Sequence, residues 1–281
     1  MSFYSIQNIL VPVDLSETSL NAVSGAVAMA KRHQANLHLL HIVEPSFGGN
    51  ISEAVFASDD KSVDILSALA GAILHTDGIK PSIIQEEGNT SDTIIKTSIS
   101  RQADVIVMGT HGASGFRSGF IGSNTYNTIK NSRCPVLALP PRKLYAAFRK
   151  ILFPVRPVAG ALSSYDIVCH FLGSQPLLNV LGLSNSPVER ETHILDKLID
   201  EIRDKLIEGK VKANALWTSG HNIAEDVLRF AQPNLVDLIV ITSALDATNK
   251  PNFIGPYTQR IINSSKVPIL SIKKVGVPAL T

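Results

Sequence analysis

Two copies of one sequence pattern fill this chain. Each copy opens with a short apolar segment that contains a proline, at residues 8–13 and 150–155. Later in each copy an aspartate leads into a second apolar segment, at residues 104–109 and 237–242. A repeat on this scale predicts two copies of one domain rather than one domain with an insertion.

Strand-like and helix-like patterns alternate in the first copy. The apolar, strand-like segments are residues 9–13, 37–43, 83–88, 105–108 and 136–139, and the helix-like segments are 16–33, 62–75, 90–101 and 123–132. Ser16 or Thr18 is the expected cap of the first helix and Thr90 or Ser91 that of the third, while residues 45–60 read as a loop. This alternation predicts an α/β fold, a parallel sheet with helices on both faces. The domains are expected at residues 1–143 and 149–281, joined by a short polar link.

Composition narrows the class of protein. The chain has 281 residues, 44% of them hydrophobic, and a net charge of +2, which does not indicate a nucleic-acid partner. No apolar run approaches the ~18–20 residues of a membrane span, and the first residues lack the layout of a signal peptide. Cys134 and Cys169 form no CxxC pair, so neither a disulfide framework nor a zinc site is indicated. We therefore expect a cytoplasmic protein.

A glycine-rich stretch follows the fourth strand-like segment. Gly109 and Gly112 precede Gly122 and Ser123 in the spacing G-x2-G-x9-G-S, and a helix-like segment comes next. Glycines allow the backbone to approach an anion, and the free N–H groups at a helix start favour negative charge. The stretch is neither a Walker A loop nor the dinucleotide fingerprint. It is typical of a phosphate site, although glycines that serve only as turns remain the alternative.

The longer pattern resembles the nucleotide-binding branch of the universal stress protein family. The residues that carry the resemblance are Met108, Gly109, His111, Gly112, Gly122, Ser123 and Thr125. The resemblance implies an adenine nucleotide alpha hydrolase-like fold with strand order 3-2-1-4-5 in each domain. It also implies that ATP, ADP or AMP is bound in the first domain. A triphosphate would carry Mg²⁺ or Mn²⁺, held chiefly by its own phosphate oxygens.

The strand order places the candidate site where the sheet reverses direction, between the first and fourth strands. The first strand ends at Pro12, Val13 and Asp14, and the fourth at Met108 and Gly109. Asp14 reads either as a turn residue or, in this position and from the resemblance, as a partner of the ribose or adenine.

Further contacts come from the resemblance alone. It implies that the backbone at Ile42 contacts the adenine and that the backbone at His111 contacts phosphate. It also implies that Ser123, Asn124 and Thr125 hold phosphate oxygens.

No catalytic motif is evident in the sequence. The favoured function is a regulatory module that binds a nucleotide, and the alternatives are a slow ATP-hydrolysing or phosphotransfer enzyme and a scaffold without ligand. The second copy departs from the motif at four positions, where Arg156, Thr242, Leu245 and Pro256 replace Asp14, Gly109, Gly112 and Ser123. One nucleotide per chain is therefore expected.

The last strand-like segments of the two copies, residues 136–139 and 269–272, are apolar sheet edges that folded proteins tend to cover. We expect the two domains to pair through these edges as an internal pseudo-dimer, as the resemblance also implies. A homodimer of whole chains is a further expected level of assembly.

Overall fold

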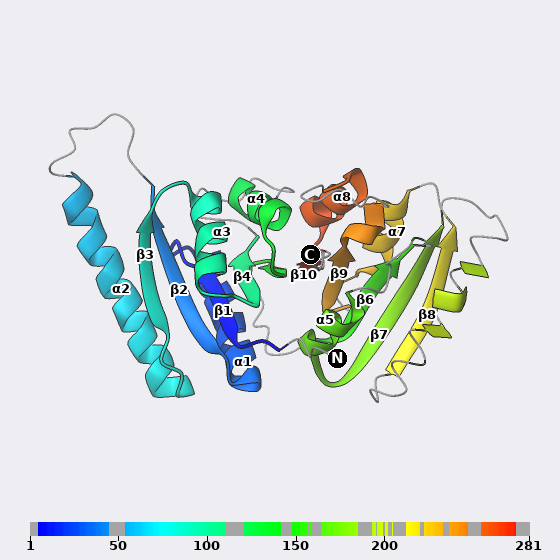
Figure 1. The fold of residues 1–281 in the computed structure, drawn as a ribbon, viewed down its shortest axis with the longest axis horizontal. Helices are drawn as coiled ribbons and strands as arrows, with labels where there is room; N and C mark the ends of the chain where they lie inside the picture. Colours follow the sequence, from blue (N-terminus) through cyan, green and yellow to red (C-terminus); the bar gives the residue numbers. More distant parts are fainter. Residues whose placement is uncertain are drawn as a thin grey trace, which may run out of the picture. The chain divides into compact units, whose positions relative to one another are not determined.

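The computed structural model describes residues 5–44, 54–110, 121–141, 148–156, 164–184, 212–219, 222–232, 236–246 and 254–273, with isolated positions at 158 and between 193 and 204. At some of these positions, including 54–60, it describes the backbone alone. Two compact units divide the chain, an N-terminal unit with strands β1 to β5 and a C-terminal unit with strands β6 to β10 (Figure 1).

Parallel strands form the sheet of the N-terminal unit. They are β1 (Asn8–Pro12), β2 (Asn36–Val43), β3 (Ser82–Glu87), β4 (Val105–Gly109) and β5 (Val136–Leu139). Their order is β3-β2-β1-β4-β5, which confirms the predicted order. All residues of β4 and β5 are buried. Burial on both faces explains why these strands read as unbroken apolar runs.

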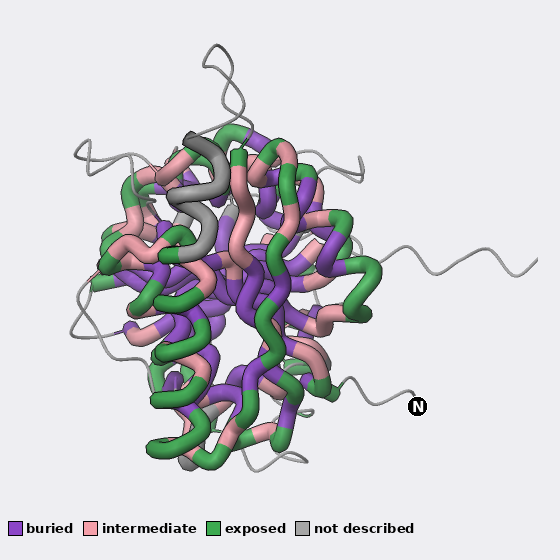
Figure 2. The backbone as a smooth tube through the Cα atoms, turned by 90° about the vertical axis from the view of Figure 1, so that its left-hand side faces the viewer, coloured by how far each residue is buried: buried purple, intermediate pink, exposed green. Residues whose placement is uncertain are grey.

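Helices cover both faces of this sheet: α1 (Glu17–His33), α2 (Ala54–Asp77), α3 (Thr90–Ser100) and α4 (Ser123–Asn131). Right-handed crossovers place α1 and α2 on one face and α3 and α4 on the other. Contacts join the helices of each pair (Figure 1). Figure 2, which looks at this unit from the side of α2, shows exposed positions along that helix and buried positions in the sheet behind it.

Capping residues explain where the helices begin. The side chain of Ser16 accepts a hydrogen bond from the Ser19 N–H, so Ser16 caps α1 as predicted. The predicted cap of α3 was wrong, because Asn89 takes this role by accepting from the Asp92 N–H. The loop expected at residues 45–60 was also wrong from Ala54 onward, where α2 already begins. Alanines at 54 and 57 favour helix, and they outweigh the two aspartates at 59 and 60.

The C-terminal unit repeats this topology. Its strands are β6 (Phe148–Val155), β7 (Leu172–Ser184), β8 (Lys212–Ser219), β9 (Leu238–Thr242) and β10 (Ile269–Ile272), in the order β8-β7-β6-β9-β10. Its described helices include α5 (Tyr165–Phe171), α7 (Ile223–Phe230), η1 (Ser243–Asp246) and α8 (Pro256–Ser264). Read from its own first strand, this is again the order 3-2-1-4-5, so the predicted repeat of the fold is confirmed.

One set of hydrogen bonds at the amino ends of the central strands recurs in both units. The Asp104 carboxylate accepts hydrogen bonds from the N–H groups of Gln7 (2.7 Å) and Asn8 (2.8 Å). In the C-terminal unit the Asp237 carboxylate accepts from Arg149 and Lys150 in the same way. Each aspartate therefore ties the start of the fourth strand to the start of the first.

Among the helices that the structure describes, none has the length and apolar character needed to cross a membrane.

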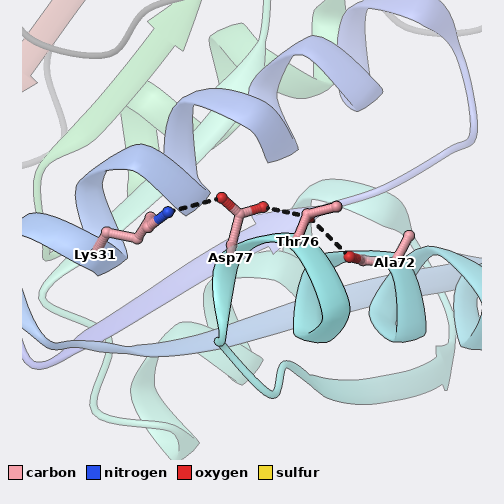
Figure 3. Close-up of polar contacts among 4 residues, drawn as sticks. All are labelled: Lys31, Ala72, Thr76 and Asp77. Atoms are coloured by element: carbon pink, nitrogen blue, oxygen red, sulfur yellow. Dashed lines mark hydrogen bonds and ion pairs between the residues drawn. The ribbon is translucent and has the colours of Figure 1, made fainter.

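An ion pair joins the carboxyl ends of α1 and α2 (Figure 3). The Lys31 ammonium donates to Asp77 Oδ1 at 3.0 Å, and the Thr76 hydroxyl donates to Asp77 Oδ2 at 2.8 Å. The hydrogen bond from Lys31, with the one from Thr76, lowers the pKa of Asp77 below its ordinary value of 3.8. The pair therefore stabilises the fold at neutral pH and weakens in acid.

Replacing Asp77 with asparagine tests this contribution. We expect the variant to be slightly less stable than the wild type, because exposed pairs contribute little. The difference should be constant above about pH 5 and shrink as the pH falls through the lowered pKa of Asp77. Denaturant unfolding across this pH range measures it. Asp64→Asn, on the exposed side of the same helix, is the control, and a stability difference for Asp77→Asn that persists unchanged in acid would contradict the assignment.

Candidate functional site

Strands β1 and β4 lie side by side at the point where the sheet reverses direction. Their register pairs Ile9 with Val105 and Leu10 with Ile106. The chain leaves β1 toward one side of the sheet and β4 toward the other. The carboxyl ends of the two strands therefore meet at one edge, as the sequence predicted. In open α/β sheets this edge is where ligands bind.

The turn after β1 is built around the exposed side chain of Asp14. Asp14 Oδ1 accepts hydrogen bonds from the backbone N–H of Ser16 at 3.0 Å and from the Ser16 hydroxyl. Leu15, between them, adopts a left-handed conformation with φ of 61°. That conformation costs a non-glycine residue roughly 1–2 kcal/mol, which the cap at Ser16 helps to offset. The turn role of Asp14 is thus confirmed, and a contact with ribose or adenine stays a prediction.

Val13 anchors this turn to strand β2. Its N–H donates to the Leu40 carbonyl at 2.8 Å, and its carbonyl lies 2.9 Å from His41 Nδ1. Its side chain is buried. His41 belongs to no motif in the sequence. The register of β1 and β2 pairs Pro12 with Leu40 and so places His41 beside Val13.

Ile42 and Met108 lie near the carboxyl ends of their strands. Ile42 is partly exposed and pairs with Glu86 of β3. It lies one residue before the carboxyl end of β2, where the adenine is expected. Met108 is buried within β4 and pairs with Ala138 of β5. Met108 therefore belongs to the core of the sheet, and its place in the motif marks the end of the strand.

Gly109 ends β4 in close contact with the first turn of α1. A Cβ atom built on Gly109 would lie 3.0 Å from the backbone carbon and oxygen of Thr18. The sequence suggested that this glycine admits a phosphate. In the structure the absent side chain admits helix α1. His111 and Gly112, which follow in the motif, lie outside the described residues.

Two hydrogen bonds attach the start of α4 to the end of β4. The Gly122 N–H donates to the Thr110 carbonyl at 2.7 Å. The Thr125 hydroxyl donates to the Gly109 carbonyl at 2.8 Å, and the Thr125 side chain is buried. The Thr125 side chain thus fixes the helix, and its backbone N–H is the donor it presents at the helix start.

The start of α4 is open. Gly122 is the N-cap, in an extended conformation, and makes no side-chain cap. Ser123 and Asn124 are exposed, and within the described part of the chain no acceptor contacts the N–H groups of Ser123, Asn124 or Thr125. Unpaired N–H groups and the positive end of the helix dipole make this an anion-binding arrangement. No cluster of three or more metal-ligating side chains occurs in the described ranges.

Replacing Gly109 with alanine tests the packing against α1. We expect a loss of about 1–3 kcal/mol in the free energy of unfolding, the usual cost of overpacking a tight contact. Gly71 in α2 is the matched control, since a Cβ added there would have no neighbouring atom within 4 Å. Gly71→Ala should stabilise the helix by roughly 0.5–1 kcal/mol. Equal effects of the two substitutions in denaturant unfolding would show that Gly109 is not sterically required.

The strand order and the helices on both faces of the sheet make the N-terminal unit a doubly wound, parallel α/β domain. A model of the universal stress protein family matches residues 5–140. Universal stress protein Sll1654 of Synechocystis is 34% identical over 134 residues, which are 48% of this chain and 85% of that protein. Universal stress protein MJ0531 of Methanocaldococcus jannaschii is 30% identical over 149 residues, 49% of this chain and 84% of that protein. The chain belongs to the universal stress protein family.

A solved structure shares the fold over nearly the whole chain. The universal stress protein from Archaeoglobus fulgidus superposes with a TM-score of 0.75 at 20% sequence identity, covering 96% of this chain and 97% of its own. The two-unit fold is therefore one that another universal stress protein also adopts.

Proposed function

We propose that the N-terminal unit binds an adenine nucleotide, ATP or a close relative, and that the protein is a cytoplasmic stress-response regulator controlled by that nucleotide. The observation that carries this proposal is the open start of α4. Among the described residues, no acceptor contacts the first N–H groups of this helix, which follows β4, and the carboxyl end of β4 adjoins that of β1.

The phosphate end of the nucleotide fits α4. The N–H groups of Ser123 and Asn124, with the Ser123 hydroxyl, are donors of the kind that phosphate oxygens accept. The bonds from Gly122 and Thr125 to β4 hold this helix start in place before any ligand arrives. A preorganised site of this kind loses little conformational entropy on binding. Mg²⁺ or Mn²⁺ accompanying a triphosphate would be held chiefly by the phosphate oxygens.

The adenosine end is assigned to the turn after β1 and the end of β2. Asp14 is exposed and its carboxylate is oriented by two hydrogen bonds from Ser16, which suits it to accept from a ribose hydroxyl. Backbone groups near Ile42 are the proposed contacts of the adenine ring.

Asp14→Ala tests this assignment in the full-length protein. We expect ATP binding to weaken by about 1–3 kcal/mol, the scale of a hydrogen bond to a charged group. Isothermal titration calorimetry measures the change, and mass spectrometry of nucleotide released on denaturation identifies the natural ligand. Asp92→Ala removes an exposed first-turn carboxylate of α3 and serves as control. Unchanged affinity in a folded Asp14→Ala variant would remove Asp14 from the site.

We also expect one nucleotide per chain, bound in the N-terminal unit. The chemistry of the motif is replaced at four matching positions of the second copy, namely Arg156, Thr242, Leu245 and Pro256. A side chain at the position of Gly112 obstructs the close approach of phosphate, and a proline at the helix start has no N–H to donate. Equilibrium titration with ATP should therefore saturate near one equivalent. A stoichiometry near two would contradict the expectation.

A further inference from the structure

The start of α8 in the C-terminal unit corresponds to the start of α4. Each helix follows a glycine N-cap, Gly255 or Gly122, that is extended and makes no side-chain cap. The two starts differ in what covers their N–H groups. Those of α4 have no acceptor among the described residues, whereas those of α8 are covered by a carboxylate from the same unit.

That carboxylate belongs to Asp246. Oδ1 accepts from the Tyr257 N–H at 2.9 Å, and Oδ2 accepts from the Thr258 N–H at 3.3 Å. Pro256 occupies the first helical position and has no N–H, so these are the first two donors of the helix. Both go to the two oxygens of one anion. A phosphate group bound at a helix start uses donors of the same kind.

Gly255 is required by this arrangement. A Cβ atom on Gly255 would lie 2.2 Å from Asp246 Cγ, far inside contact distance. In the sequence, Gly255 occupies the position that Gly122 has in the first copy. The structure gives it a present role, since only glycine leaves room for the carboxylate to reach the helix start.

The segment that carries Asp246 is held in place from two sides. It forms the short helix η1 directly after β9, and the Leu245 side chain is buried. Arg156 Nη1 donates to the Leu245 carbonyl at 3.3 Å, and the Arg156 guanidinium lies 5.8 Å from the centre of the Tyr257 ring. Arg156 and Leu245 are two of the residues that replace the motif. They therefore serve to position the carboxylate that closes the helix start.

We propose that Asp246 is an internal substitute for phosphate and that it excludes nucleotide from the C-terminal unit. Aligning residues 253–255 with 120–122 without a gap places Asp246 at the position of Ala113, within the first copy's phosphate loop. A phosphate approaching α8 meets donors that are already bonded and a like charge that repels it. This inference rests on the proposed function for its meaning, since it explains why one unit alone binds nucleotide.

The test follows the backbone amide signals of Tyr257 and Thr258 by NMR in the full-length protein, with inorganic phosphate as the probe. In the wild type these signals should not respond to phosphate or to ATP. In Asp246→Ala the two signals should shift saturably as phosphate is added. The phosphate affinity obtained from these shifts should be at least about tenfold higher than that of the wild type, a factor that corresponds to about 1.4 kcal/mol. Asp246→Asn, which keeps the shape and removes the charge, should fall between them.

Asn222→Ala is the matched control, because Asn222 caps α7 in the same unit by accepting from the Glu225 N–H. It should lower stability without making the α8 amides respond to phosphate. A saturable response of Tyr257 and Thr258 in the wild type, or no response in folded Asp246→Ala and Asp246→Asn variants, would overturn the inference. Failure of ATP to shift the amides of Ser123 and Asn124 would instead overturn the proposed function and leave the phosphate result at α8 standing.

Discussion

The attachment of α4 to the end of β4 is the constraint on which the candidate site depends. A helix start attracts an anion only if its N–H groups point to the place where the anion sits. Here the carbonyls of Gly109, the last residue of β4, and of Thr110, which follows it, accept hydrogen bonds from the Thr125 hydroxyl and the Gly122 N–H. The orientation of the helix is thereby set by the sheet itself. The orientation of the N–H groups at the start of α4 is therefore a property of the folded unit.

Much of the fold could be predicted from the sequence because strands such as β4 and β5 are buried on both faces. Such strands read as unbroken apolar runs, and the run at Val136–Leu139 was delimited to the residue. Boundaries governed by weaker signals were missed. Asn89 rather than Thr90 caps α3, since capping depends on which side chain reaches a free N–H. Helix α2 begins at Ala54, within the stretch 45–60 that was predicted to be a loop.

The candidate site was predicted less completely, because several of its residues act through contacts between distant parts of the chain. The role of Gly109 depends on Thr18, which lies ninety-one positions earlier and meets it only after β1 and β4 pair. The position of His41 depends on strand register. Asp246 belongs to no sequence motif. Its carboxylate reaches the start of α8 only because η1 follows β9 directly. The spacing of the glycines correctly placed Gly109 at the carboxyl end of β4. It did not predict that Gly109 is needed for packing against α1.

The two units separate what the fold needs from what a ligand needs. Asp104 and Asp237 make the same bonds between strands, so both copies retain this anchor. The hydroxyls of Ser132 and Ser265 likewise donate to the carbonyls of Cys134 and Val267, two residues later in the chain. At the carboxyl ends of the first and fourth strands the two copies differ, and Arg156 stands in place of Asp14.

Gly109 has a mechanical consequence for the N-terminal unit. Its missing side chain lets the first turn of α1 press against the backbone, and its carbonyl holds the first turn of α4. The first turns of α1 and α4 therefore both contact Gly109. The turn at Asp14 and the start of α4 are thus not independent parts of the fold, because both are built against the Gly109 backbone.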